Sequence, residues 1–498
     1  MKYLKKSILI FGIIATVSLF SGCIDNNFSE NPLHKLTFSA DTLSFDTLFS
    51  TIPSYTAELM IYNRNNKALK ISKIYLENGS NSVFRFNLDG FVPNSANVLT
   101  DIEIAAHDSL FLMVEVTFNE NDSVLPVYIS ENLVFNTNGN PQKIVLEAYS
   151  QDAVIFRDKT LTQNTTFTSE KPYLIFNFLH IAAGKTLTIN AGTKIFLHKN
   201  ASIIADGNII SNGTVNERVI IRGDRFDLAY TDVPYDFLPA QWGMIYLQNE
   251  TGDNIFKNTT IRSGSGILLL GNSIIHTKLR LENCVIHNMN GFGILSQFGN
   301  LEIVNSEISN CRNACVAILG GAIKMVHSTI ANYFTWNTSD TSREDPALFI
   351  SNFFVQDKVV YPFPITSAVV ENSIIFGNQK NELVLKDTAD TNGSIMFNVL
   401  ISNCLIRAEK IERPELENII WSYAGNQPNG KVDTVFVNPL VDWKNFKLKG
   451  YYNFQLAENS RAKDVANQQV AAQYPTDLLG KNRFADAKPD LGAYERFD

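Results

Sequence analysis

The stretch "LENCVIHN", Leu281 to Asn288, returns in altered form along the second half of the chain. The related stretches read "KNTTIRSG", "VNSEISNC", "VHSTIANY", "VENSIIFG" and "ISNCLIRA". Each has a polar residue, usually Asn, then a small residue, one free position and Ile. The polar position falls at Asn258, Asn283, Asn305, His327, Asn372 and Asn403. One pattern that recurs at a nearly regular interval indicates a structural unit that is built many times.

The intervals between these polar positions are 25, 22, 22, 45 and 31 residues. Apolar residues alternate within each unit, which excludes heptads and helical spacing, and the Leu ladder of a leucine-rich repeat is missing. Three short parallel strands per unit explain the pattern best. The sequence therefore predicts a right-handed parallel β-helix, with the interval of 45 residues interpreted as a doubled unit and the last one as a coil with an insertion.

Stacking of such coils about 4.8 Å apart places equivalent residues in columns. We expect the Ile of each unit and the small residue two places before it to point into the core. The Asn residues are expected to hydrogen-bond to each other and to the backbone of the turn, with an interruption at His327. On this prediction Cys284 and Cys404 are small buried fillers, because they occupy the small-residue position.

Composition excludes some classes of function. The chain has 498 residues, 45% hydrophobic residues and a formal net charge of −8. This hydrophobic content is typical of a folded globular protein. A nucleic-acid partner is not expected, because no basic stripe is present.

The first 22 residues have the pattern of a signal peptide: Lys2, Lys5 and Lys6 precede an apolar stretch too short to span a bilayer. The stretch ends in "LFSGC", which resembles the bacterial lipobox, although Phe20 replaces the more usual Leu. The resemblance implies lipid attachment at Cys23, a tether over residues 23–35, and a location in the cell envelope at the outer membrane of a Gram-negative bacterium. A plain secretory signal is the alternative.

Residues 36–152 alternate in short bursts such as "AELMIYN", "LKISKIYL" and "LFLMVEVTF", separated by turns such as "TNGNPQ". Period-two runs at this spacing predict an antiparallel β-sandwich. The segment "FDTLFSTIPSYTAELMIYNRNNKALKISKIYL" resembles the Hydin-type immunoglobulin-like domains that precede repeat domains in bacterial lipoproteins. That resemblance implies a spacer or docking module without chemistry of its own.

Residues 153–435 are assigned to the β-helix and 436–498 to a capping segment. "LTINAGTKIFLHKNASIIADGNIISNGTVNERVIIRGDR" with "QWGMIYL" is similar to the opening coils of bacterial β-helix lipoproteins of the pectate-lyase-like class. "FVNPLVDWKNFKL" and "KPDLGAYE" resemble the closing segment of such proteins. We expect the closing segment to cover the last coil, because an open strand edge invites aggregation.

A search for catalytic residues gives only weak candidates. Hydrolysis needs two carboxylates about 5 to 9.5 Å apart. Glu282 and Glu371 share a column, but about four coils, or roughly 19 Å, are expected between them. For a lyase, Arg262 and His287 fall in one outward column, with Ser309 next. The more ordinary interpretation is a solvated outer face.

The candidate metal-binding residues do not have the spacing of a known metal site. Asp224, Asp227, Asp232 and Asp236 cluster in "GDRFDLAYTDVPYDFLPAQWG", but without the spacing of a known calcium loop. Cys311 and Cys315 lack the further ligands of a zinc site. No metal and no cofactor is therefore assigned.

The long interval contains the segment 332–364, which departs from the repeat. Insertions in solenoids gather on one face and commonly form a binding surface. Trp336, Tyr333 and Arg343 lie in this segment and are the candidates for contacts with a carbohydrate, Trp336 by stacking on a sugar ring. Packing of Trp336 beneath its own loop is the alternative.

Taken together, the sequence predicts a lipid-anchored envelope protein whose β-helix face binds a glycan or a partner protein without catalysis. A lyase or hydrolase acting on acidic polysaccharide, and a structural or adhesive stalk, stay open as alternatives. The sequence does not indicate an oligomeric state.

Overall fold

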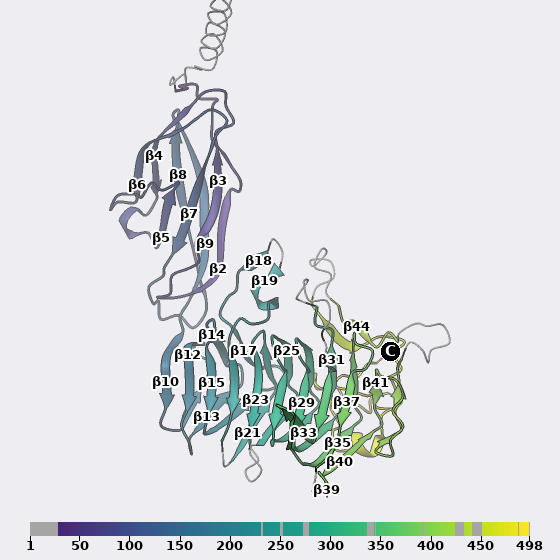
Figure 1. Cartoon of the computed structure of the whole chain (residues 1–498). Coiled ribbons are helices and arrows are strands. Elements are labelled where there is room, and N and C mark those ends of the chain that lie inside the picture. Colours follow the sequence, from purple (N-terminus) through teal and green to yellow (C-terminus); the bar gives the residue numbers. More distant parts are fainter. Residues whose placement is uncertain are drawn as a thin grey trace, which may run out of the picture. The chain divides into compact units, whose positions relative to one another are not determined.

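The computed structural model describes residues 28–230, 233–249, 252–271, 278–335, 343, 345–390, 393–423, 433–440, 451–486 and 488–497. The chain divides into two compact units between Asp152 and Ala153 (Figure 1). Cys23 and the predicted signal peptide lie outside the described residues. Among the described residues, no helix has both the length and the apolar character that crossing a bilayer requires.

The first unit is a β-sandwich of a four-stranded and a five-stranded sheet. Its buried and exposed residues alternate along the strands, as in "AELMIY" of β3, so each sheet turns one face to a shared apolar core. All strand pairs are antiparallel except β2 with β9. The strands are β1 (Thr37–Phe38), β3 (Ala57–Tyr62), β7 (Ser109–Val116) and β5 (Phe84–Leu88) in one sheet, and β2 (Thr42–Phe49), β9 (Asn140–Gln151), β8 (Val127–Thr137), β4 (Leu69–Leu76) and β6 (Val98–Ile104) in the other.

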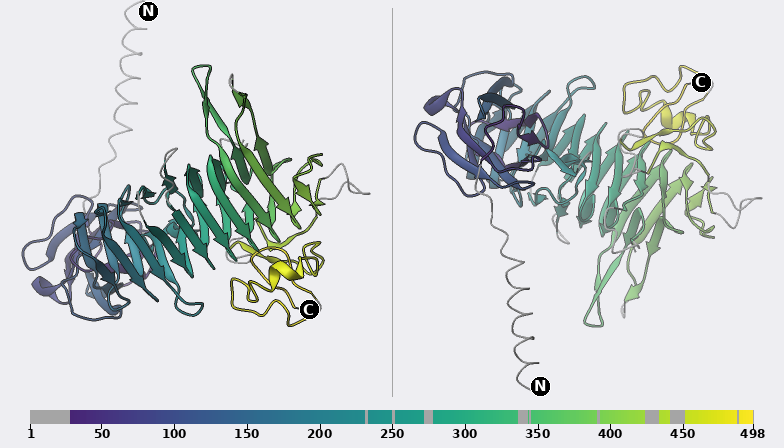
Figure 2. Two further views of the ribbon diagram at one scale, coloured as in Figure 1. Left: turned by 90° about the horizontal axis from the view of Figure 1, so that it is seen from below. Right: turned by 90° about the horizontal axis from the view of Figure 1, so that it is seen from above.

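The second unit is a coil in which each turn contributes one strand to each of three parallel faces (Figures 1 and 2). It opens with β10 (Val154–Leu161) and the long β12 (Tyr173–Ile181), which pairs with strands of two faces. The flank sheet contains β14 (Lys194–Leu197), β17 (Val219–Gly223), β22 (Thr259–Arg262), β25 (Val285–Met289), β28 (Glu307–Cys311), β31 (Thr329–Asn332), β36 (Ile374–Gly377), β41 (Leu405–Ile406) and β43 (Ile420–Trp421).

The other two faces follow in chain order after each flank strand. The groove sheet contains β15 (Ser202–Ala205), β20 (Met244–Leu247), β23 (Gly266–Leu270), β26 (Ile294–Gln297), β29 (Val316–Leu319), β32 (Leu348–Ser351) and β37 (Leu383–Lys386). The charged sheet contains β11 (Thr165–Phe167), β13 (Thr186–Asn190), β16 (Asn208–Asn212), β21 (Asp253–Lys257), β24 (Lys278–Glu282), β27 (Asn300–Val304), β30 (Gly321–Val326), β35 (Ile365–Glu371), β40 (Phe397–Ser402) and β42 (Leu416–Glu417). Three parallel strands per unit confirm the predicted coil.

The repeated Ile residues form one buried column in the flank sheet, as predicted. Register pairs each with the next, and none is exposed: Ile261, Ile286, Ile308, Ile330, Ile375 and Ile406. The small residues two places earlier are also fully buried: Thr259, Cys284, Ser306, Ser328, Ser373 and Cys404. Serine serves this position well because each hydroxyl accepts the backbone N–H of the preceding coil, as Ser306 Oγ does from Cys284 at 3.0 Å.

Backbone conformation, and not the predicted ladder of hydrogen-bonded side chains, explains why Asn recurs in this column. Every residue of the column is left-handed, with φ between 43° and 54°: Asn258, Asn283, Asn305, His327, Asn372 and Asn403. This conformation bends the chain from the charged sheet into the flank sheet, and Asn tolerates it better than most residues. Within the column, the structure gives one side-chain contact, between Asn372 Nδ2 and His327 Nε2 at 3.0 Å.

The interval of 45 residues is one coil and not two, which corrects the predicted doubling. Strand β30 pairs directly with β35, and β31 pairs directly with β36. The extra residues fall in two places along the chain, between β31 and β32 and at the hairpin of β33 (Phe353–Gln356) and β34 (Val359–Pro362). The sequence pattern could not distinguish a second coil that lacks the motif from an insertion, because both lengthen the interval between motifs.

The C-terminal segment lies along the flank sheet, whereas the prediction placed it over the last coil. Its apolar residues pack on Ala331, Ile374, Phe376 and Leu405 of β31, β36 and β41. Its regular elements are β44 (Phe436–Asn438), β45 (Asn453–Leu456) and the short helix α3 (Gln468–Ala471). In Figure 2 this yellow segment and the green β33–β34 hairpin project from opposite sides of the coil.

Candidate functional site: a groove beside the β33–β34 hairpin

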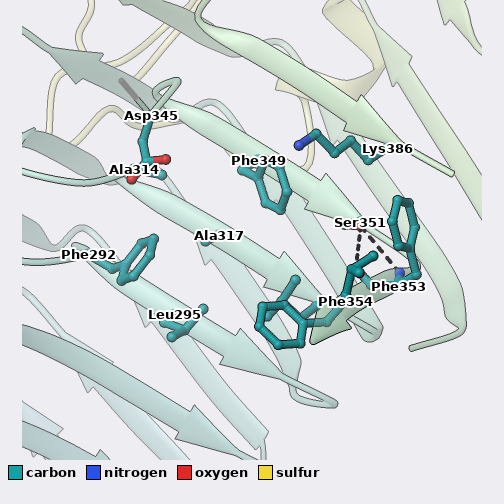
Figure 3. Close-up of a pocket in the computed structure, with 12 residues that line it drawn as sticks. Phe292, Leu295, Ala314, Ala317, Asp345, Phe349, Ser351, Phe353, Phe354 and Lys386 are labelled. Atoms are coloured by element: carbon teal, nitrogen blue, oxygen red, sulfur yellow. Dashed lines mark hydrogen bonds between the residues drawn. The ribbon is translucent and has the colours of Figure 1, made fainter. Parts of the chain in front are cut away.

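A hollow in the described part of the coil lies on the outer face of the groove sheet. Its floor comes from outward residues at one register position of three neighbouring strands: Leu295, Ala317 and Phe349. The small Ala317 leaves a depression between its larger neighbours. The hairpin supplies a wall through Phe353, Phe354 and Val355 (Figure 3). We call this space, of about 340 Å³, the hairpin groove.

Few polar groups line the hairpin groove. The Ser351 hydroxyl is already used, since it donates to the Phe353 carbonyl at 2.8 Å. Asp345 accepts a hydrogen bond from Asn313 Nδ2 at 2.7 Å. Lys386 extends beside Phe349, with its ammonium nitrogen 5.4 Å from the ring centre. Any ligand would therefore meet mainly apolar surface.

The hairpin itself presents an apolar surface to solvent. Five of its large apolar side chains are between 42% and 52% exposed: Phe354, Val355, Val359, Val360 and Tyr361. A cluster of this kind on a two-stranded ribbon is unusual for a surface without a ligand or partner. The sequence placed a binding surface in segment 332–364, and this hairpin falls within it.

Two of the residues in this segment that the sequence predicted as carbohydrate contacts are not on the surface. Tyr333 and Arg343 are only 8% exposed each, which corrects their assignment as surface contacts. Tyr333 packs among the apolar residues beneath the C-terminal segment. Burial raises the pKa of its hydroxyl. Trp336 lies outside the described residues.

Arg343 anchors the chain shortly before β32. Its guanidinium lies 2.5 Å from Glu382 Oε1, and both side chains are almost completely buried. It also donates to the carbonyls of Asn332 and Asp345. This buried ion pair fixes the chain just before β32, where Asp345 reaches the hairpin groove.

Arg262 and His287 are neighbours on β22 and β25, in the predicted column, and both are half-buried. Arg262 Nε donates to Asp236 Oδ1 at 3.0 Å. His287 lies under Tyr452 of the C-terminal segment, with ring centres 5.1 Å apart. Burial, and secondarily the charge of Arg262, lowers the pKa of His287 to about 3.

His287 belongs to a covered polar chain that the sequence did not reveal. Its Nδ1 lies 2.8 Å from Ser309 Oγ, which donates to Glu307 Oε1 at 2.5 Å. Tyr494 of the C-terminal segment donates to the other oxygen of Glu307. Burial raises the pKa of Glu307, and the hydrogen bonds from Ser309 and Tyr494 oppose that rise. Because the serine proton is directed at Glu307 and not at His287, this is not the arrangement of an activated nucleophile.

The described aspartates of the excursion have different basic side chains as partners. Asp224 binds His198 Nδ1 at 2.7 Å, Asp227 accepts from Arg225, and Asp236 bridges Arg222 and Arg262. Asp232 lies outside the described residues. Within the described ranges, no three His, Cys, Asp or Glu side chains gather as a metal site would require.

Glu282 and Glu302 of the charged sheet form ion pairs. Glu282 and Glu371 are separated by three coil steps and not four, which is still about 14 Å. Sequence reasoning missed that Glu282 and Glu302 share a face, because it compared only equal positions of the units. Arg280 contacts both, at 3.3 and 3.0 Å. Its guanidinium occupies the space that a glycosidic bond would need between them.

The cysteines behave as core residues. Cys284, Cys311, Cys315 and Cys404 are buried free thiols. Burial raises the pKa of Cys284 to about 11 and that of Cys404 to about 12. Neither thiol is therefore prepared to act as a thiolate near neutral pH.

The fold agrees with a known family. The family described as right handed beta helix region matches residues 144–338 and 243–441, more than half of the chain. The chain therefore belongs to the right-handed β-helix family, which confirms the predicted fold class and its hand.

Several solved structures are similar at low identity. The catalytic unit of a thermostable GH87 α-1,3-glucanase from Streptomyces thermodiastaticus is 10% identical, with a TM-score of 0.25, over 73% of this chain and 88% of that one. A PL6 family alginate lyase is 12% identical, with a TM-score of 0.21, over 57% and 52%. A protein of unknown function from Porphyromonas gingivalis is 14% identical, with a TM-score of 0.17, over 23% of this chain and 46% of its own length. A comparison with curated proteins gave no match.

Proposed function

We propose that the protein is a non-catalytic binding module that holds an apolar segment of a partner protein in the hairpin groove. The observation that supports this function is the lining of the groove, in which Leu295, Phe349 and Phe354 surround the small Ala317. Burial of aromatic and aliphatic side chains of a partner against such a surface is the main source of affinity in protein interfaces.

A glycan is the second candidate, because an aromatic ring beside a cation, here Phe349 and Lys386, suits an acidic sugar. The groove sheet of this chain nevertheless supplies few hydrogen-bonding groups at the groove, and a sugar needs several. The solved structures similar to this chain include an α-1,3-glucanase and an alginate lyase, and those activities are theirs. We therefore rank the partner protein first.

The test presents the purified full-length protein with immobilised acidic and neutral polysaccharides and with a displayed library of random peptides. We expect the wild type to retain apolar peptides. Phe349→Ala is expected to lose this retention while its unfolding curve stays the same as that of the wild type. Retention of a polysaccharide alone would replace the partner protein by a glycan. New reducing or unsaturated ends in the polysaccharide would overturn the non-catalytic proposal.

The location is proposed from the N-terminal sequence. We place the protein in the cell envelope, anchored by a lipid on Cys23, with the sandwich as an immunoglobulin-like spacer between anchor and coil. Cys23→Ser is expected to move the protein from the membrane fraction to the soluble fraction, measured by immunoblotting of separated fractions. Unchanged association with the membrane would contradict the lipid anchor.

A further inference from the structure

We infer that the segment bound in the hairpin groove is extended and carries an acidic side chain opposite Lys386; this inference rests on the proposed function. Three features of the described residues lead to it: the position of the charged groups, the edge of β33, and the floor of the groove.

The two charged residues of the groove lie at opposite ends of its strands. Asp345 precedes β32, whereas Lys386 is the last residue of β37. Because β32 and β37 are parallel, the backbones of these residues lie toward opposite ends of the groove, and the Lys386 side chain runs back over Phe349 (Figure 3). Asp345 is bound by Asn313, but Lys386 has no carboxylate partner among the described residues. Lys380, which precedes β37, and Arg413 are by contrast paired with Glu409 and Asp387.

An ammonium that lies beside an apolar groove without a counter-ion favours an anionic group on the ligand. The cation also lies 5.4 Å from the Phe349 ring, so one ligand can contact both the ring and the charge. Since the rest of the lining is apolar, the ligand that fits combines apolar side chains with one acidic group.

The backbone of β33 indicates an extended conformation for this ligand. Phe353 directs its N–H to Ser351 Oγ at 3.3 Å, and its carbonyl accepts from the same hydroxyl. Phe353 therefore points its backbone groups away from β34 and toward the groove sheet. Alternation along a strand places the N–H and C=O of Val355 on the same edge. A partner segment beside β33 would pair with this edge, as extended peptides do on other exposed sheet edges.

The floor accepts an apolar side chain of such a segment. Leu295, Ala317 and Phe349 are equivalent residues of successive coils, so their spacing is about 4.8 Å per step. An extended segment turns every second side chain to one face, so one of its apolar side chains can fill the gap that the small Ala317 leaves between Leu295 and Phe349.

The test is a charge reversal. Peptides are selected from the same random library with the full-length wild type, with Lys386→Glu and with Lys358→Glu. Lys358 is the matched control, because it lies on the same hairpin, at its turn, and does not line the groove. Wild type is expected to enrich peptides with alternating apolar residues and one Asp or Glu at a fixed position.

Lys386→Glu is expected to weaken binding of the best wild-type peptide about tenfold. The same variant should enrich Lys or Arg at the position where wild type enriches Asp or Glu, whereas Lys358→Glu keeps the wild-type preference. One outcome overturns the inference and leaves the proposed function standing: peptides are enriched and Phe349→Ala abolishes their binding, but they show no acidic preference and do not respond to Lys386→Glu. No enrichment by any of the proteins overturns both.

Discussion

At the scale of single residues, backbone conformation explains the repeat better than side-chain chemistry does. The polar position of every unit is left-handed, and its N–H donates to a carbonyl of the following coil, as Asn283 does to Val304 at 3.1 Å. Asn is favoured there because its short polar side chain tolerates positive φ. His327 fills the position under the same constraint, with φ of 46°.

Asn283 offers a direct test of this explanation. Its φ is 54°, and its Oδ1 has no hydrogen-bond partner among the described residues. Asn283→Gly should therefore change the free energy of unfolding by less than about 0.5 kcal/mol, whereas Asn283→Val should lower it by about 1 to 2 kcal/mol. Urea denaturation measures both. Equal losses in the two variants would mean that the side chain, and not the conformation, is what the position requires.

His287 makes stability depend on pH. Its pKa of about 3 in the folded protein lies below the ordinary value of 6.5, so the unfolded chain binds a proton first on acidification. The stability linked to neutral His287 is complete above pH 6.5 and is lost as the pH falls toward 3. We expect His287→Gln to show a shallower loss of the free energy of unfolding between pH 6.5 and 5, measured by denaturation at a series of pH values. Parallel curves for variant and wild type would contradict this account of His287.

At the scale of elements, the closing motif "KPDLGAYE" docks the C-terminal segment on the flank sheet. Gly492 donates its N–H to the Asn372 carbonyl at 2.8 Å, and Ala493 donates to Thr329 Oγ1 at 3.0 Å. Glu495, the last residue of the motif, forms a buried ion pair with Arg483, with 3.0 Å between the charged atoms. The polar column of the repeat and the closing motif therefore form one interface.

Gly492→Ala should loosen this interface. A Cβ at Gly492 would lie 2.6 Å from Thr329 Oγ1 and 2.7 Å from Ile374 Cδ1, at a φ of +86°. Gly480→Ala is the matched control, because its φ is +81° but its nearest neighbour, Val215, is 3.5 Å away. We expect a loss of about 1 kcal/mol for the control and about 2 to 3 kcal/mol for Gly492→Ala. Faster hydrogen exchange over residues 451–497 should accompany the larger loss; similar effects of the two variants would show that steric contact is unimportant there.

The sequence predicted the elements of the coil well and the excursions poorly. Columns such as Ile261 to Ile406 follow from a period that local residues set, so they are visible without coordinates. The hairpin groove is not, because Leu295, Ala317 and Phe349 lie in different units and fit no motif. The contacts that cover Tyr333 and His287 were not predictable either, since they come from the C-terminal segment, which is far away in the chain. The proposed stacking of Trp336 on a sugar ring stays a prediction.

At the scale of the whole molecule, the two sides of the coil that carry additions have different roles. The C-terminal segment buries the flank sheet and its polar chain from His287 to Tyr494, which makes that side structural. On the groove sheet, the hairpin leaves apolar side chains in solvent beside a hollow of about 340 Å³. Right-handed β-helices host many activities, so function is assigned here from the groove and not from the fold.

The most direct test of the central claim is the equilibrium affinity of an enriched peptide for two variants of the hairpin. Phe354 lines the groove and is 48% exposed, whereas Val359 does not line it and is 52% exposed. Removing a central aromatic contact typically costs tenfold or more in affinity. We predict a loss of about tenfold or more for Phe354→Asn and an unchanged affinity for Val359→Asn, measured by calorimetry. Equal affinity for both variants and the wild type would contradict binding in the hairpin groove.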